Sequence, residues 1–252
     1  ELAVDDSTQT SFVAPVPVFP VFLDLPLLRG NEVEHAPHIA VTATPWPGSV
    51  AVYSAPSDEG YVLNRLLERS AVIGVTQTGL AAAAPSRWDN GPGVEVKVFG
   101  GILSSATLDG VLNGANVMAI GDGSSANWEV LQFSDATLIA ENTYVLSSLL
   151  RGQAGTEAVM PEIWPPGSLV VLLNEVPTQI ELATGARNLA RYYRVGPAQR
   201  PYSDASYRHE IEAFSGIGLR PYAPAHLGAV SNLSGDLDLT WMRRTRIDGD
   251  GW

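Results

Sequence analysis

The chain has 252 residues, of which 45% are hydrophobic and only 17% are charged. This composition excludes a disordered chain, and no apolar run reaches the roughly 18 residues of a membrane-spanning helix, so we expect no transmembrane segment. The formal net charge of -12 argues against direct nucleic-acid binding, and the absence of cysteine excludes disulfides, thiolate catalysis and cysteine-ligated metals.

Short runs of β-branched and aromatic residues, separated by Gly and Pro, recur along the whole chain. They occupy residues 16–23, 38–43, 50–53, 94–99, 128–133, 143–150, 169–173 and 192–195. The run at 94–99 alternates in part, which is typical of a half-buried strand, whereas 169–173 is apolar throughout, as in a strand buried on both faces. Only residues 60–70 and 183–194 have helical spacing. The sequence predicts a mainly all-β protein, with consecutive sandwich- or barrel-like modules and at most short helices.

Segments rich in turn-forming residues divide the chain into three expected modules. The first boundary lies in 85–93 (PSRWDNGPG) and the second in 220–224 (RPYAP). We expect a β-rich module at 1–88 with an extended Pro-rich leading segment, and a second β-rich module at 89–220. Because Leu, Asp, Leu, Thr and Trp alternate at 237–241, we expect residues 221–252 to begin an incomplete fibronectin-III-like module.

No catalytic, cofactor-binding or metal-binding constellation is apparent. The chain lacks a Gly-x-Ser-x-Gly nucleophile elbow, the dinucleotide-binding glycine pattern and a phosphate-binding P-loop. Two histidines occur in EHAPH at residues 34–38, but Pro37 breaks any helix that would align them. A flexible loop is therefore favoured over metal ligation. We predict no enzymatic activity, no cofactor and no metal.

Tryptophans offer an alternative function. Trp46 and Trp164 stand beside prolines in turn-like contexts, where an aromatic ring can be exposed, and Trp88 lies in the turn-rich segment 85–93. Packing in a core is the usual role of tryptophan. The alternative is a carbohydrate-binding module that stacks cell-surface polysaccharide on Trp46, Trp88 or Trp164. Part of a cell-wall glycan hydrolase is a further alternative.

Several segments, in a fixed order, resemble one protein family. They are VFLDLPLL at 21–28, TATPWPG at 42–48, VAVY at 50–53, LNGAN at 112–116, WEVLQF at 128–133 and, most distinctive, LLRGQAGTE at 149–157. Together they resemble the C-terminal part of the large baseplate, or host-specificity, protein of gene transfer agents. This family is related in role to siphophage tail-tip attachment proteins. The resemblance extends from about residue 14 to the end of the chain.

The resemblance implies a structural component of the tail tip or baseplate of a phage-like particle. Such a component is made in the bacterial cytoplasm and released with the particle. It helps to assemble the baseplate and contacts the recipient cell for DNA delivery. The resemblance also implies a homotrimer that meets the hub and the distal tail protein, and it supplies no catalytic residue. Because the chain has no initiator Met, we expect it to be a segment of a longer polypeptide.

The motif LLRGQAGTE contains the candidate site that the residues themselves indicate. Arg151 follows an expected strand and precedes Gly152, so the chain can turn sharply after it. Its guanidinium could bridge backbone carbonyls, or pair with Glu157 or Glu129 across a turn. We expect Arg151, Gly152 and Glu157 to form a structural latch rather than a binding site.

Overall fold

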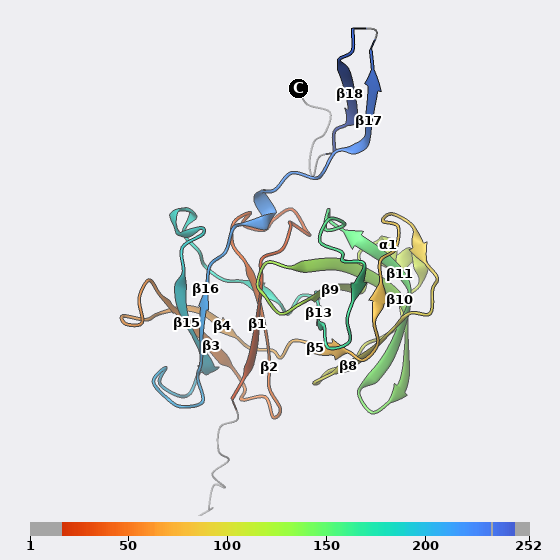
Figure 1. Ribbon diagram of the computed structural model, residues 1–252. Helices are drawn as coiled ribbons and strands as arrows, with labels where there is room; N and C mark the ends of the chain where they lie inside the picture. Colours follow the sequence, from red (N-terminus) through yellow and green to blue (C-terminus); the bar gives the residue numbers. More distant parts are fainter. Residues whose placement is uncertain (1–16, 233, 245–252) are drawn as a thin grey trace, which may run out of the picture.

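The computed structural model describes residues 17–232 and 234–244, and almost all of its regular structure is β-strand (Figure 1). This confirms the mainly all-β fold class. None of the helices in the described part of the chain has the length and apolar composition to span a membrane. Of the expected Pro-rich leading segment, residues before 17 lie outside the described part, and the first strand begins at Phe19.

A closed six-stranded barrel is the largest unit. Its strands run in the order β10-β9-β13-β5-β8-β11, and β11 pairs back with β10, so the sheet closes on itself with antiparallel pairing throughout. Closure leaves no free sheet edge. The strands are β5 (Ile73–Thr76), β8 (Val94–Val98), β9 (Val117–Gly121), β10 (Trp128–Ala140), β11 (Thr143–Gln153) and β13 (Leu169–Leu172).

Three short strands and one helix decorate the barrel. β7 (Trp88–Asp89) pairs with β11, and β6 (Leu80–Ala81) pairs with β12 (Ile163–Trp164). The helix α1 (Leu108–Leu112) begins at Thr107, whose hydroxyl accepts a hydrogen bond from the Gly110 amide. This side-chain cap satisfies one of the amides that a helix start leaves without a partner.

Side-chain alternation explains how the barrel strands are buried. Val94, Val96 and Val98 belong to the barrel core, whereas Glu95 and Lys97 are partly or fully exposed. The alternation at 94–98 therefore marks a half-buried strand, as predicted. β13 is buried on both faces, also as predicted, because Val170 joins the barrel core and Val171 packs in a second cluster outside it.

The barrel is one of three packed layers. A four-stranded sheet, in the order β16-β15-β3-β4, forms the opposite layer, and a three-stranded sheet, β1-β2-β14, lies between the two (Figure 1). The four-stranded sheet consists of β3 (Val50–Ala55), β4 (Val62–Leu67), β15 (Arg191–Pro197) and β16 (Arg208–Glu212); the three-stranded sheet consists of β1 (Phe19–Leu23), β2 (His38–Thr42) and β14 (Thr178–Gln179).

The middle sheet is apolar on both faces because it packs against both neighbours. In β1, Val21 and Leu23 join the cluster on the barrel side, whereas Phe22 joins the cluster on the side of the four-stranded sheet. Strands β3 and β15 are neighbours in that sheet, so it takes strands from both sides of the boundary expected at residues 88–89. The chain crosses between the outer layers rather than completing one before the next.

The two segments with helical spacing have other structures. Residues 62–67 form β4, which pairs with β3, and the segment 183–194 contains only a 3-10 turn, η1 (Thr184–Ala186), before β15 begins. Neither segment forms a helix, because residues 62–67 and 191–194 pair within the four-stranded sheet instead. A second 3-10 turn, η2 (Ile217–Leu219), leads toward the C-terminal hairpin.

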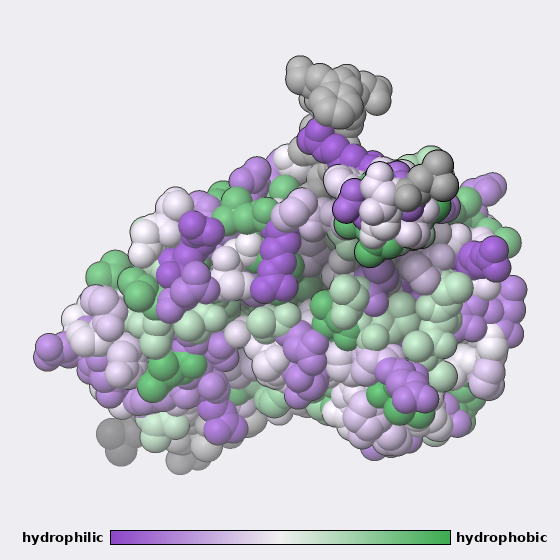
Figure 2. All heavy atoms as spheres, turned by 45° about the horizontal axis from the view of Figure 1, so that its top comes forward, coloured by the Kyte–Doolittle hydropathy of each residue, from purple (hydrophilic) through white to green (hydrophobic). Residues whose placement is uncertain are grey.

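A two-stranded hairpin, β17 (Ala225–Ser231) and β18 (Leu237–Met242), stands away from the three layers in Figure 1 and lies in front of them in the turned view of Figure 2. It falls in the expected fibronectin-III-like module, of which residues 245–252 lie outside the described part. Cross-strand pairing of Ala229 with Leu239 places Leu227, Leu237, Leu239 and Trp241 on one face. All four side chains are exposed, so this hairpin face is apolar and uncovered by the described residues.

Candidate functional site

Arg151 forms a buried ion pair with Glu129. The two residues lie on the neighbouring barrel strands β11 and β10, and both side chains are 0% exposed. Arg151 Nε donates to Glu129 Oε1 at 2.7 Å, and Arg151 Nη2 donates to Oε2 at 2.9 Å. Two parallel hydrogen bonds of this kind give the strongest geometry between arginine and a carboxylate.

Neighbouring groups form hydrogen bonds with the remaining polar atoms of the ion pair. Glu129 also accepts hydrogen bonds from the Trp164 indole at 2.7 Å and from the Gly152 amide at 3.1 Å. Arg151 Nη1 donates to the carbonyl of Ala81 at 2.7 Å. A buried ion pair is tolerated when hydrogen bonds satisfy its remaining polar atoms. This one therefore ties β10 and β11 to the short strands β6 and β12, where Ala81 and Trp164 lie.

The predicted latch residues divide into two groups. Arg151 uses the partners expected for it, a backbone carbonyl and Glu129. Glu157 does not pair with Arg151; its carboxylate pairs with Arg244, just after the C-terminal hairpin. Gly152 adopts a φ of +60°, and a Cβ there would come within 2.9 Å of the Glu157 Cα, so this position favours glycine.

The loop that follows Gly152 also contacts the chain segments just before and just after the C-terminal hairpin. Gly155 has a φ of +82°, and a Cβ at this position would overlap the ring of Tyr222. The guanidinium carbon of Arg244 lies 5.0 Å from the centre of that ring. LLRGQAGTE thus contacts two parts of the molecule: Arg151 faces inward, and Gly155 and Glu157 face the chain on either side of the hairpin.

The three tryptophans proposed for sugar stacking occupy different environments. Trp164 is only 3% exposed, and its indole N–H donates a hydrogen bond to Glu129. The prediction of an exposed stacking ring was therefore wrong for this residue. Trp46 is half-buried, and its Nε1 donates to the carbonyls of Gly48 and Glu68. Trp88 is half-buried on β7. The structure does not gather the three rings on one element.

The histidines of EHAPH lie in a different setting from the flexible loop that we expected. His38 opens β2 and is buried, and His35 Nε2 lies 3.0 Å from the carbonyl oxygen of Leu182. Strand pairing with β1 and β14 holds His38 in place. Among the described residues, no group of three His, Asp or Glu side chains could hold a metal ion.

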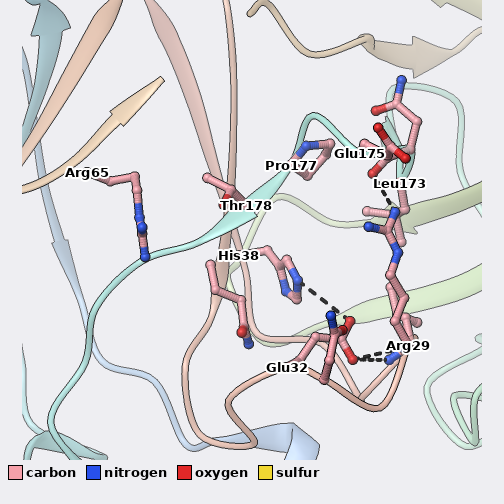
Figure 3. Close-up of a pocket in the computed structure, with 12 residues that line it drawn as sticks. Arg29, Glu32, His38, Arg65, Leu173, Glu175, Pro177 and Thr178 are labelled. Carbon is pink, nitrogen blue, oxygen red and sulfur yellow. Dashed lines mark hydrogen bonds and ion pairs between the residues drawn. The ribbon is translucent and has the colours of Figure 1, made fainter. Parts of the chain in front are cut away.

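His38 faces a polar pocket (Figure 3) with a volume of about 300 Å³. Its ring points toward the carboxylate of Glu32, with 4.0 Å between Nε2 and Oε1. Burial lowers the pKa of His38 below its ordinary value of 6.5, although Glu32 acts in the opposite direction. His38 is therefore a neutral imidazole at neutral pH, able to donate one hydrogen bond and accept another.

A second buried carboxylate, that of Asp24, binds the segment of the chain that leads to the hairpin. It is 2% exposed and accepts hydrogen bonds from the amides of Ser215, Gly216 and Ile217 at 2.8–2.9 Å. Several amide donors on one carboxylate satisfy a buried charge without a cationic partner. The sequence analysis missed this role; a lone acid inside the apolar run VFLDLPLL is the signal that could have indicated it.

Part of the chain is similar to a known protein family. Residues 71–171 match a family model described as Rcc01698-like, C-terminal. No curated protein matches the chain. The matched segment starts just before β5 and ends within β13, so it contains five barrel strands, most of the sixth, and both Arg151 and Glu129. Over its barrel, this chain is similar to the C-terminal region of Rcc01698-like proteins.

Proposed function

We propose that this chain is a structural component of the tail tip or baseplate of a phage-like particle of the gene transfer agent type. In this role it helps to assemble the baseplate and contacts the recipient cell during DNA delivery. The proposal includes a homotrimer in contact with the hub and the distal tail protein, and it assigns no enzymatic activity.

The similarity of the barrel to the Rcc01698-like C-terminal family is the observation that carries this proposal. That family name is associated with gene transfer agent proteins. The motif LLRGQAGTE lies inside the matched segment, where it supplies Arg151 to the buried ion pair and Gly155 to the link with the hairpin. The residues behind the family resemblance are thus residues that shape this fold.

The hairpin is the surface best suited to a neighbouring subunit. Isolated two-stranded hairpins are marginally stable in water, and exposed apolar patches commonly mark interaction sites. Leu227 is 71% exposed and Trp241 is 58% exposed, on the same face of β17 and β18. We propose that this face packs against another baseplate subunit, while the barrel serves as a rigid support.

Substitutions on the two hairpin faces test this proposal in a bacterium that produces the particles. Leu239→Ser with Trp241→Ser removes two of the four apolar side chains on this face, whereas Val230→Ser with Thr240→Ser changes the opposite face as a matched control. We expect the first pair to lower the yield of particles with complete tail tips and to reduce gene transfer at least tenfold. Wild-type assembly and transfer with the first pair would contradict a docking role.

A further inference from the structure

The pocket beside His38 has the size and the polar lining of a small-molecule site. It opens between the 28–32 loop, the start of β2 and the segment 173–179 that leads into β14 (Figure 3). Its volume of about 300 Å³ is at the lower end of the range for ligand pockets, which suits one ring-sized ligand. None of its residues belongs to the Arg151 ion pair or to the hairpin.

Glu32 is fixed in this pocket by only one of its two carboxylate oxygens. Oε2 accepts hydrogen bonds from the amides of Leu28, Arg29 and Gly30 at 2.9, 2.8 and 3.2 Å. This cluster of amide donors holds the carboxylate in a single orientation. Oε1 is left to face the ring of His38.

His38 and Glu32 are too far apart for a direct hydrogen bond. The 4.0 Å between His38 Nε2 and Glu32 Oε1 exceeds the usual limit of about 3.2 Å. A gap of this kind between polar groups is commonly filled by a bridging oxygen atom. The side chains of His38 and Glu32 are 11% and 9% exposed, so Nε2 and Oε1 form a mostly buried pair of polar atoms that a ligand oxygen could bridge.

The charges around the pocket select the kind of ligand. Two carboxylates in the lining, Glu32 and Glu175, disfavour a phosphate or a carboxylate, and two guanidinium groups, Arg29 and Arg65, disfavour a cation. A neutral hydroxyl fits the gap, because its oxygen can accept from the imidazole N–H while its proton is donated to Oε1. Arg29 Nη2 donates to the carbonyl of Asn174. This hydrogen bond holds the Arg29 guanidinium at the rim of the pocket, where its other N–H groups can donate to a ligand.

We propose that this pocket binds a neutral sugar residue, with one sugar hydroxyl placed between His38 Nε2 and Glu32 Oε1. Arg29 donates to a second hydroxyl at the rim. This site differs from the tryptophan platforms predicted from the sequence, and it does not depend on the proposed role at the tail tip.

Nuclear magnetic resonance of the ¹⁵N-labelled full chain tests the site directly. The probes are D-glucose, D-galactose, D-mannose and N-acetylglucosamine, each added up to about 50 mM, so that even a site with a Kd on the order of 1 mM is saturated. Inorganic phosphate serves as the anion probe. We expect at least one sugar to shift the amide signals of 28–32, 38 and 173–179, and phosphate to leave them unchanged.

Variants establish whether the proposed groups make the contact. Glu32→Gln and His38→Phe are expected to weaken sugar binding at least tenfold, whereas Glu34→Gln and His209→Phe, which lie outside the pocket, leave it unchanged. Arg29→Met is an exposed substitution that keeps the buried pair, and it is expected to weaken binding severalfold even if the other two variants fold poorly. Absence of sugar binding, phosphate binding at these residues, or sugar binding unaffected by Arg29→Met and the folded pocket variants would overturn the proposal.

Discussion

Replacing Arg151 with methionine is expected to destabilise the barrel strongly. The substitution keeps most of the side-chain volume but removes two hydrogen bonds to Glu129 and one to Ala81. Glu129 then remains buried without its cationic partner, with only the Trp164 indole and the Gly152 amide as donors. Removing one partner of a buried ion pair costs about 3–5 kcal/mol, and we expect a loss of that size here.

A loss of about 3–5 kcal/mol predicts a large decrease in the melting temperature. For a chain of this size, each kcal/mol shifts the melting temperature by about 2–4 °C, so Arg151→Met is expected to lower it by about 6–20 °C. Urea unfolding followed by tryptophan fluorescence measures the same loss, because the Trp164 indole is bonded to Glu129. Arg69→Met, an exposed control, is expected to change stability by less than about 0.5 kcal/mol.

A second substitution separates charge from packing. Gln at position 129 can still accept from Trp164 and Gly152 but carries no charge. Glu129→Gln is therefore expected to restore part of the stability that Arg151→Met loses, with a coupling of about 1–3 kcal/mol between the two sites. Additive losses in the double variant, or a loss below about 1 kcal/mol for Arg151→Met, would refute this account of the ion pair.

Three further predictions concern the surrounding structure. Gly155→Ala places a methyl group against Tyr222 at a positive φ, so limited proteolysis should cut the chain between Tyr222 and the hairpin faster than in the wild type. Asp24→Ala leaves the amides of 215–217, one buried and two partly buried, without their acceptor, and we expect a loss of about 2–4 kcal/mol in urea unfolding; an unchanged midpoint would contradict this. His38 has a lowered pKa in the folded chain, so the unfolded chain binds its proton more readily as the pH falls below 6.5. Its contribution to stability is complete above pH 6.5 and is lost below it, and His38→Phe should flatten that acid-side decline; parallel stability curves between pH 7.5 and 5.5 would argue against it.

The sequence predicts strand faces well where the pattern is local. Alternation at 94–98 and the apolar run at 169–173 identified strands whose burial the structure confirms, because side-chain period depends on neighbouring residues alone. The local pattern gave the wrong structure for residues 62–67. Their spacing fits a helix, but pairing with β3 decides their structure, and the sequence does not reveal which strand lies alongside.

The role of a candidate site residue could be predicted from the sequence only where its hydrogen-bond partner could also be named. Arg151 was identified with Glu157 or Glu129 as its possible partner, and the structure shows Glu129 because the two residues lie on neighbouring barrel strands. Trp164 was considered as a possible exposed stacking ring because prolines follow it, yet its indole bonds to Glu129, 35 positions away in the sequence. The pairing of Glu157 with Arg244 likewise depends on where the hairpin sits, which no local pattern shows.

Immunogold electron microscopy of purified particles, with an antibody raised against this chain, tests the proposed function most directly. The account predicts gold label at the end of the tail distal to the head, and co-purification of the chain with intact particles. Label on the head, label along the whole tail, or absence of the chain from particles that still transfer genes would contradict it.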